Sequence, residues 1–176
     1  MSNISSVSTA VGGCVPNVAI DLKKIDETLD IRAAGQVGDD DAGRYILGQL
    51  EKHGIDTRLV KVAADDSTSF SDVMTEAGTG ERTFFHYRGA NAGFSPSDLP
   101  VGDLDCHMLH IGYILLLDSF DRENAEYGTE MAKFLCEAQS AGIKTSVDAV
   151  SDESGRFAEK VLPALKYADN AIMNET

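Results

Sequence analysis

Apolar residues recur along the chain at two spacings, and these spacings predict helices and strands in alternation. Helical spacing indicates one helix that begins after Gly13 and three more over residues 41–53, 124–141 and 155–168. In the first helix we expect Val18, Leu22 and Ile25 to form the buried face. Short apolar runs indicate buried strands over 31–36, 106–111, 143–148 and 170–173. This alternation is typical of a three-layer α/β fold, in which helices flank a mostly parallel sheet.

The spacing changes to two between residues 57 and 91, which predicts strands over 56–62, 68–75 and 82–87. The last two should form a hairpin around the turn at residues 77–80, with Met74 opposite Thr83. In this register one face carries Phe70, Asp72, Met74, Phe85 and Tyr87. The other face carries Ser69, Ser71, Val73, Phe84, His86 and Arg88. We expect this hairpin to stand off the main sheet.

Length and charge exclude several classes of function. A chain of 176 residues can bury about 70% of its unfolded surface and usually forms one domain. Its net charge of −14 repels nucleic acids and anionic membranes, so we expect neither as a partner. The first eleven residues show no signal peptide, and the longest apolar run, 111–117, is too short to span a bilayer. We therefore expect a soluble protein of the cytoplasm.

Two adjacent glycines, Gly12 and Gly13, precede the first predicted helix. Glycines let a backbone approach another molecule closely, and the free N–H groups of a helix start favour oxygen-rich ligands. Asn17 falls in the first turn, where its amide can donate and accept hydrogen bonds to a small polar ligand. Taken alone, the pattern also fits an ordinary Gly-Gly turn before an amphipathic helix.

Neither the acidic residues nor the histidines and cysteines indicate a metal site. We interpret the aspartates at 39–41 as caps of the second helix, because three consecutive residues cannot all face one ion. The four histidines lack the paired spacing of a zinc helix, and we interpret His110 as a packed core residue. The three cysteines have unrelated spacings, so we expect buried thiols and no direct metal ligand.

Several motifs follow one another along the chain. Gly12, Gly13, Asn17 and Ala19 form Gly-Gly-x-x-x-Asn-x-Ala. Residues 35–43 read Gly-Gln-Val-Gly-Asp-Asp-Asp-Ala-Gly, the strand-rich segment 57–91 comes next, and Asn174 begins an Asn-x-x-Glu motif. This order resembles that of the ribokinase-like (PfkB) family of carbohydrate kinases over nearly the whole chain. The resemblance implies a ribokinase-like α/β domain over 1–176, with a protruding β-lid at 57–91.

The resemblance also implies a function, ligands and site residues. The expected activity is ATP-dependent phosphorylation of a sugar hydroxyl, with ATP and Mg²⁺ as cofactors, in a homodimer that pairs through the lids. Sugar-binding residues would be Gly12, Gly13, Cys14, Asn17, His86, Arg88 and Gly112. Asp148 and Asn174 would lie near the phosphate and Mg²⁺.

The chain also departs from the family pattern. The Gly-Ala-Gly-Asp element that supplies the catalytic base is missing from these residues, as is the usual first strand before Met1. We therefore expect an incomplete chain that holds mainly the sugar-binding half and is inactive alone. Residues 148–152 keep only Asp148 of the Asp-x-Asn-x-Arg run found in relatives that bind acidic keto-sugars. Gly112 stands where ribokinases proper carry a glutamate, so the identity of the sugar stays open.

Two alternatives remain open at this point. A nucleoside kinase needs an apolar or aromatic slot for the base, which Phe84 and Tyr113 could supply. A non-catalytic sugar-binding protein derived from a kinase would explain the missing catalytic element.

Overall fold

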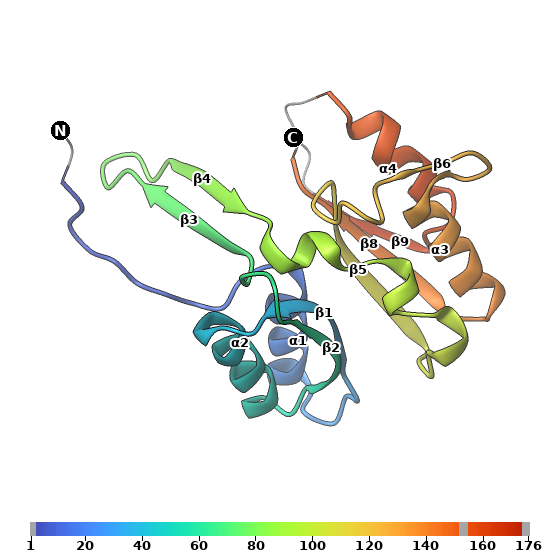
Figure 1. Cartoon of the computed structure of the whole chain (residues 1–176), viewed down its shortest axis with the longest axis horizontal. Helices are drawn as coiled ribbons and strands as arrows, with labels where there is room; N and C mark the ends of the chain where they lie inside the picture. Colours follow the sequence, from blue (N-terminus) through green and yellow to red (C-terminus); the bar gives the residue numbers. More distant parts are fainter. Residues whose placement is uncertain (1–2, 152–154, 174–176) are drawn as a thin grey trace.

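Two parallel sheets and the helices that cover them form the scaffold of the chain (Figure 1). The computed structural model describes residues 3–151 and 155–173. One sheet pairs β1 (Arg32–Gly38) with β2 (Asp56–Ala63). The other has the order β5 (Met108–Ile114), β8 (Lys144–Ala149), β9 (Asn170–Ile172), and all of these pairings are parallel. The predicted α/β class is confirmed.

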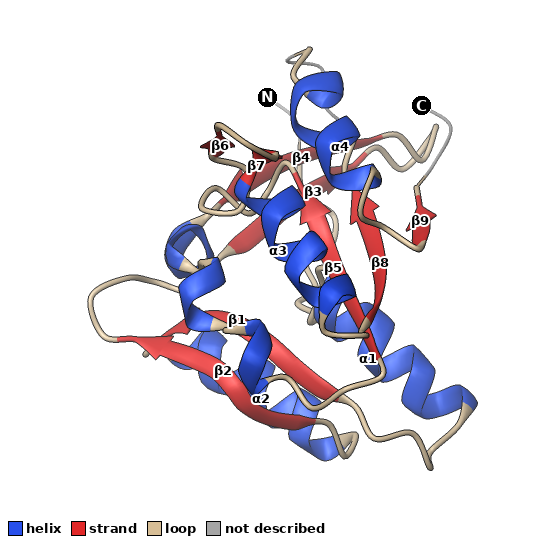
Figure 2. Ribbon diagram, turned by 90° about the vertical axis from the view of Figure 1, so that its right-hand side faces the viewer, coloured by secondary structure: helices blue, strands red, loops and turns tan. Residues whose placement is uncertain are grey.

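The α-helices of the described residues lie against these sheets. They are α1 (Cys14–Ile25), α2 (Asp41–Lys52), α3 (Glu130–Ser140) and α4 (Phe157–Leu165). Figure 2 shows α3 and α4 on one face of the β5–β8–β9 sheet, while α2 contacts β1 and β2. Helix α1 contacts both β1 and β5, so it joins the two sheets. No helix within residues 3–151 and 155–173 is long and apolar enough to cross a membrane.

Shorter elements connect the sheets and helices. They are the hairpin of β3 (Phe70–Thr75) and β4 (Arg82–Tyr87), the antiparallel pair β6 (Glu123–Asn124) and β7 (Gly128–Thr129), and the 3₁₀ turns Gly89–Gly93, Pro96–Asp98 and Val101–Asp103.

Two groups of buried apolar side chains hold the layers together. The larger group packs α3 and α4 on β5 and β8, and in it the rings of Phe120 and Phe134 meet edge to face at 5.3 Å. The smaller group of Ala19, Ala33, Leu50 and Ile55 joins α1 and α2 to β1. Full burial of one large apolar side chain stabilises a fold by about 1.5–3 kcal/mol.

The predicted buried face of α1 is wrong in its second half. Leu22 is 40% exposed and Ile25 is 81% exposed. The helix packs through shorter side chains near its start, where Cys14 and Ala19 are buried. After Ile20, no side chain of α1 packs into either core. Leu22 and Ile25 therefore have no apolar surface to pack against, although their spacing is helical.

Helix α3 begins later than predicted. Residues 124–129, expected to be helical, form β6, β7 and the turn between them. Gly128 has a φ of 89°, and the Thr129 hydroxyl accepts a 3.1 Å hydrogen bond from Ala132 N, which makes Thr129 the helix cap. The rest of the predicted stripe (Met131, Phe134, Leu135 and Ala138) is buried. Tyr127 lies outside the helix and packs against the ring of Tyr167.

Two smaller expectations also need correction. Strand β5 runs to Ile114, because Ile114 still pairs with Ala149, so Gly112 lies inside the strand rather than after it. In α2 the expected apolar residue Ala42 is exposed, and Gly43 takes the inward position. A Cβ at Gly43 would collide with Gly38 O, so only glycine lets this turn of the helix approach the strand end.

The hairpin has the predicted register, with Met74 opposite Thr83, which confirms the predicted faces for residues 70–75 and 82–87. Ser69 and Arg88, expected on one of these faces, lie outside the paired strands. All the residues of β3 and β4 are exposed. In Figure 1 the hairpin projects away from both parallel sheets, which confirms that it stands off them.

Asp40 fixes the base of the hairpin and caps α2 at the same time. Its carboxylate accepts hydrogen bonds from Gly43 N (2.8 Å), Thr68 N (2.8 Å) and Thr68 Oγ1 (2.6 Å). Thr68 Oγ1 in turn accepts a 2.9 Å bond from Gly38 N. These bonds hold the pKa of Asp40 at about 2, the Thr68 hydroxyl being the largest cause. The predicted capping role is confirmed, and the attachment of the hairpin is an addition to it.

Candidate functional site

The start of α1 lies at the carboxyl ends of β5 and β8, where ligands bind in open α/β sheets. Gly13 precedes the helix with a φ of 87°, a conformation that favours glycine, and no side chain caps the helix. Gly12 and Gly13 are exposed, and a Cβ built on either one would meet no atom within 4 Å. The backbone that leads into α1 at Gly12 and Gly13 therefore borders open space.

Close packing holds this helix start on the sheet. A Cβ at Gly112 of β5 would lie 2.7 Å from Cys14 Sγ and 3.2 Å from the Cβ atoms of Cys14 and Asp148. Gly112 therefore has a packing role, because any side chain there would push α1 away from β5. Three predicted site residues (Cys14, Gly112 and Asp148) thus meet at one place.

His110 lies in the same cluster. Its Nε2 is 3.3 Å from Cys14 Sγ, and its Nδ1 is 3.0 Å from Ser146 Oγ on the neighbouring strand. Burial raises the pKa of the Cys14 thiol to about 11, with a further rise from Asp148, and burial lowers the pKa of His110. A protonated thiol therefore faces a neutral imidazole.

Sequence reasoning placed His110 in the core and missed this contact. One signal was available, because alternation along a strand puts His110 on the same face as Gly112, and Ser146 on the same face as Asp148. What the alternation does not show is that α1 covers this face with Cys14.

Asn17 lies one helical turn after Cys14 and is exposed. Its backbone N–H donates to Gly13 O at 3.3 Å, which closes the first turn. Among the described residues, no partner forms a hydrogen bond with its side-chain amide. That amide is therefore available to a ligand at the helix start.

The two candidate residues of the hairpin are already engaged with other groups. Arg88 Nη2 donates to Leu115 O at 3.1 Å, and Nη1 lies 3.0 Å from Asp118 Oδ1. Because Leu115 directly follows β5, Arg88 holds the end of β4 beside the carboxyl end of that strand. His86 Nδ1 lies 2.8 Å from Ser71 Oγ, and burial together with Arg88 lowers the pKa of His86. Asn174 lies outside the described residues.

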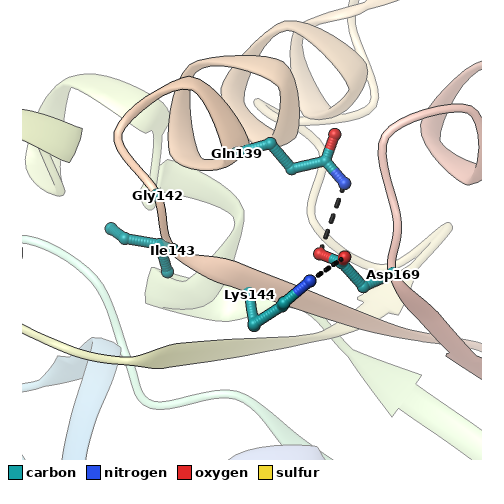
Figure 3. A pocket seen from close by; sticks show the side chains of 5 residues that line it. All are labelled: Gln139, Gly142, Ile143, Lys144 and Asp169. Carbon is teal, nitrogen blue, oxygen red and sulfur yellow. Dashed lines mark hydrogen bonds and ion pairs between the residues drawn. The ribbon is translucent and has the colours of Figure 1, made fainter.

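A separate small pocket lies at the opposite, amino-terminal edge of the β5–β8–β9 sheet (Figure 3). Its Asp169 carboxylate accepts hydrogen bonds from Thr145 N (2.9 Å), Lys144 Nζ (2.9 Å) and Gln139 Nε2 (3.3 Å). These bonds lower the pKa of Asp169, that from Thr145 N most of all. The polar groups satisfy one another, so we interpret the pocket as a structural link between β8, β9 and α3.

Comparison with known proteins identifies relatives of the chain. It is 32% identical over 129 residues to a probable fructokinase-3 of Arabidopsis thaliana, which covers 70% of this chain and 36% of that protein. It is 25% identical over 150 residues to a 5-dehydro-2-deoxygluconokinase of Mesomycoplasma hyopneumoniae, which covers 84% of this chain and 42% of that protein.

Solved structures show the same fold. A fructokinase from Xylella fastidiosa with bound ATP superposes with a TM-score of 0.71 at 21% identity, over 91% of this chain and 50% of that one. The chain thus spans half or less of the length of each of these proteins. The family model of pfkB family carbohydrate kinases matches residues 1–176. The chain therefore belongs to the pfkB family of carbohydrate kinases.

Proposed function

We propose that this chain supplies the sugar-binding part of an ATP-dependent carbohydrate kinase. The observation that carries the proposal is the uncapped start of α1, exposed at the carboxyl ends of β5 and β8 in a chain of this family. Backbone N–H groups around Gly12, Gly13 and Cys14, together with the free amide of Asn17, would bind sugar hydroxyls. Gly112 lets these groups sit close to the sheet.

The hairpin would close over the bound sugar as a lid. His86 lies on the more polar face of β4, and Arg88, which directly follows β4, joins that strand to the end of β5. A negatively charged or hydroxyl-rich ligand would compete with Asp118 for the Arg88 guanidinium, since a guanidinium readily donates two parallel hydrogen bonds to a pair of oxygen atoms. Residues 57–91 are accordingly proposed as the lid region.

ATP and Mg²⁺ are the proposed cofactors, and one structural neighbour is a fructokinase with bound ATP. Mg²⁺ binds in kinases through one or two carboxylates plus water and phosphate oxygens, and Asp148 offers one such carboxylate beside the helix start. When bound, Mg²⁺ neutralises charge on the transferred phosphoryl group. We assign no catalytic base among the described residues. We place the protein in the cytoplasm, where ATP is available.

Sugar binding to this protein tests the proposal directly. Isothermal titration calorimetry with ketoses, aldoses, keto-sugar acids and nucleosides would identify the ligand class. The Asn17→Ala variant should bind the sugar about 5–150-fold more weakly, because loss of one buried hydrogen-bond partner costs about 1–3 kcal/mol. Asn170→Ala, at an exposed position in β9, is the matched control and should bind as the wild type does.

Two results would contradict the proposal. Binding of no sugar at all would remove the assigned role, and an unchanged affinity in Asn17→Ala would remove Asn17 from the site. Binding of nucleosides alone would favour the nucleoside-kinase alternative.

We further propose that the lids pair in a homodimer. The hairpin face of Phe70, Asp72, Met74, Phe85 and Tyr87 is mainly apolar and exposed, with Phe85 at 59% exposed. A second copy of the hairpin would cover this face, since exposed apolar surface of this kind marks interaction sites. Replacing Phe85 and Tyr87 with serine should shift the sedimenting species from dimer to monomer in analytical ultracentrifugation. A wild-type protein that sediments as a monomer at high concentration would refute lid pairing.

A further inference from the structure

Three side chains of metal-binding type converge beneath the start of α1. Cys14 Sγ, a ring nitrogen of His110 and a carboxylate oxygen of Asp148 all lie within 4.8 Å of one another. Cys14 is buried, and the other two are half-buried. The three residues come from α1, β5 and β8, so their meeting depends on the tertiary fold and not on a motif.

His110 has the orientation of a metal-binding imidazole. Its Nδ1 pairs with Ser146 Oγ at 3.0 Å, which leaves Nε2 facing Cys14 Sγ at 3.3 Å. Histidine ligands commonly hold their second ring nitrogen in such a hydrogen bond, which fixes the ring.

The spacing of the cluster fits a tetrahedral ion. Ligand atoms on tetrahedral zinc are separated by about 3.3–3.7 Å, and the Cys14–His110 distance of 3.3 Å agrees with that range. The other separations are at most 4.8 Å, so they would have to shorten by up to about 1.5 Å, a movement that a rotation of the Asp148 side chain would have to supply.

The donor set selects among the possible uses of the cluster. Sulfur and imidazole nitrogen favour zinc, whereas Mg²⁺ and Ca²⁺ prefer sites made of oxygen. Catalytic cysteines sit in electropositive and partly exposed surroundings. Cys14 is 5% exposed and lies beside a carboxylate, so the cluster does not suit a nucleophile.

We propose that Cys14, His110 and Asp148 bind one Zn²⁺ ion, with water as the fourth ligand. On binding, the S–H bond of Cys14 breaks, its proton goes to solvent, and the sulfur bonds to the metal. The ion would tie the start of α1 to β5 and β8 and so hold Gly13 and Asn17 in position. The proposal does not depend on kinase activity, although it shares Cys14 with the proposed sugar site and Asp148 with the carboxylate proposed for Mg²⁺.

Cobalt substitution of the purified, metal-free protein tests the site without sugar or ATP. Co²⁺ should bind with one equivalent per chain and give a near-ultraviolet thiolate-to-cobalt charge-transfer band, which Zn²⁺ removes and excess Mg²⁺ does not. Cys14→Ser should abolish the band. Ser146→Ala should weaken Zn²⁺ binding by about 10–100-fold, because it removes the hydrogen bond that orients His110.

Matched variants separate this site from adventitious binding. Cys136→Ser and His107→Gln remove the same side-chain types outside the cluster, and both should keep the band and the affinity. A folded wild type without the band overturns the proposal, as does a band that persists in Cys14→Ser. If Cys14→Ser does not fold, His110→Gln decides the matter. This variant removes the nitrogen ligand, so it should lose Zn²⁺ binding, and a Zn²⁺ affinity equal to that of His107→Gln overturns the site.

Discussion

The close approach of α1 to β5 makes Gly112 the most sensitive position of the candidate site. In Gly112→Ala the new methyl group would sit 2.7 Å from Cys14 Sγ and 3.2 Å from Asp148 Cβ. Non-bonded heavy atoms prefer about 3.5–4.0 Å, so the start of α1 must move by roughly 0.8–1.3 Å. The displacement would also carry Gly13 and Asn17 away from their present positions.

The size of the effect follows from two opposing terms. Overpacking of a buried contact costs about 1–3 kcal/mol, whereas replacing glycine by alanine within a strand recovers about 0.5–1 kcal/mol of backbone entropy. We expect Gly112→Ala to lower the free energy of unfolding by about 1–2 kcal/mol. Part of this loss should return when Cys14→Ala removes the sulfur atom that the methyl group meets, with a coupling of about 1 kcal/mol.

Urea unfolding followed by circular dichroism measures these free energies for the wild type, both single variants and the double variant. Gly48→Ala is the matched control, because it lies within α2 and its Cβ would meet no atom within 4 Å. That control should stabilise the protein by about 0.5–1 kcal/mol. The packing argument fails if Gly112→Ala is as stable as Gly48→Ala, or if the Gly112 and Cys14 substitutions act additively.

Two further predictions concern the hairpin base and a half-buried carboxyl group. Thr68→Val should lower the free energy of unfolding by about 1–3 kcal/mol, because the Gly38 N–H loses its buried acceptor. It should also speed proteolysis of the hairpin, and an unchanged rate of proteolysis would contradict this role of Thr68. Burial raises the pKa of Asp121 from 3.8 to about 6, so the stability of the wild type should fall as pH rises from 4 through 6. In urea unfolding, Asp121→Asn should remove this pH dependence of the free energy of unfolding. At pH 7 its free energy of unfolding should exceed that of the wild type by about 1–3 kcal/mol, a value reduced for solvent screening. Parallel plots of unfolding free energy against pH for the two proteins would refute the reasoning.

The amino-acid sequence by itself determined the order and type of most elements. The hairpin register is an example, because alternation along 70–75 and 82–87 with a glycine-containing turn allows Met74 to face Thr83. The capping role of Asp40 is another, since it depends on residues three positions apart. Both features rest on contacts between residues that are near in the chain.

Local sequence patterns gave wrong predictions where burial or a helix boundary depends on the surrounding structure. Leu22 and Ile25 have helical spacing, yet they remain exposed because α1 packs on the two cores through residues no later than Ile20. The prediction that the helix begins at residue 124 did not take the turn at Gly128 into account. Because Gly128 has a positive φ and Thr129 caps the helix, the helix begins at Glu130. Burial is a property of the assembled layers, so spacing shows which face is apolar but not whether anything covers it.

Only the tertiary structure decided the composition of the candidate site. Cys14 and His110 are 96 positions apart, and no pattern in either segment indicates that they meet. Their contact results from the absence of a side chain at Gly112, which lets α1 sit directly on β5. The sequence therefore predicted the start of α1 as a candidate ligand-binding element, while the packing of α1 across β5 determined which side chains lie beneath it.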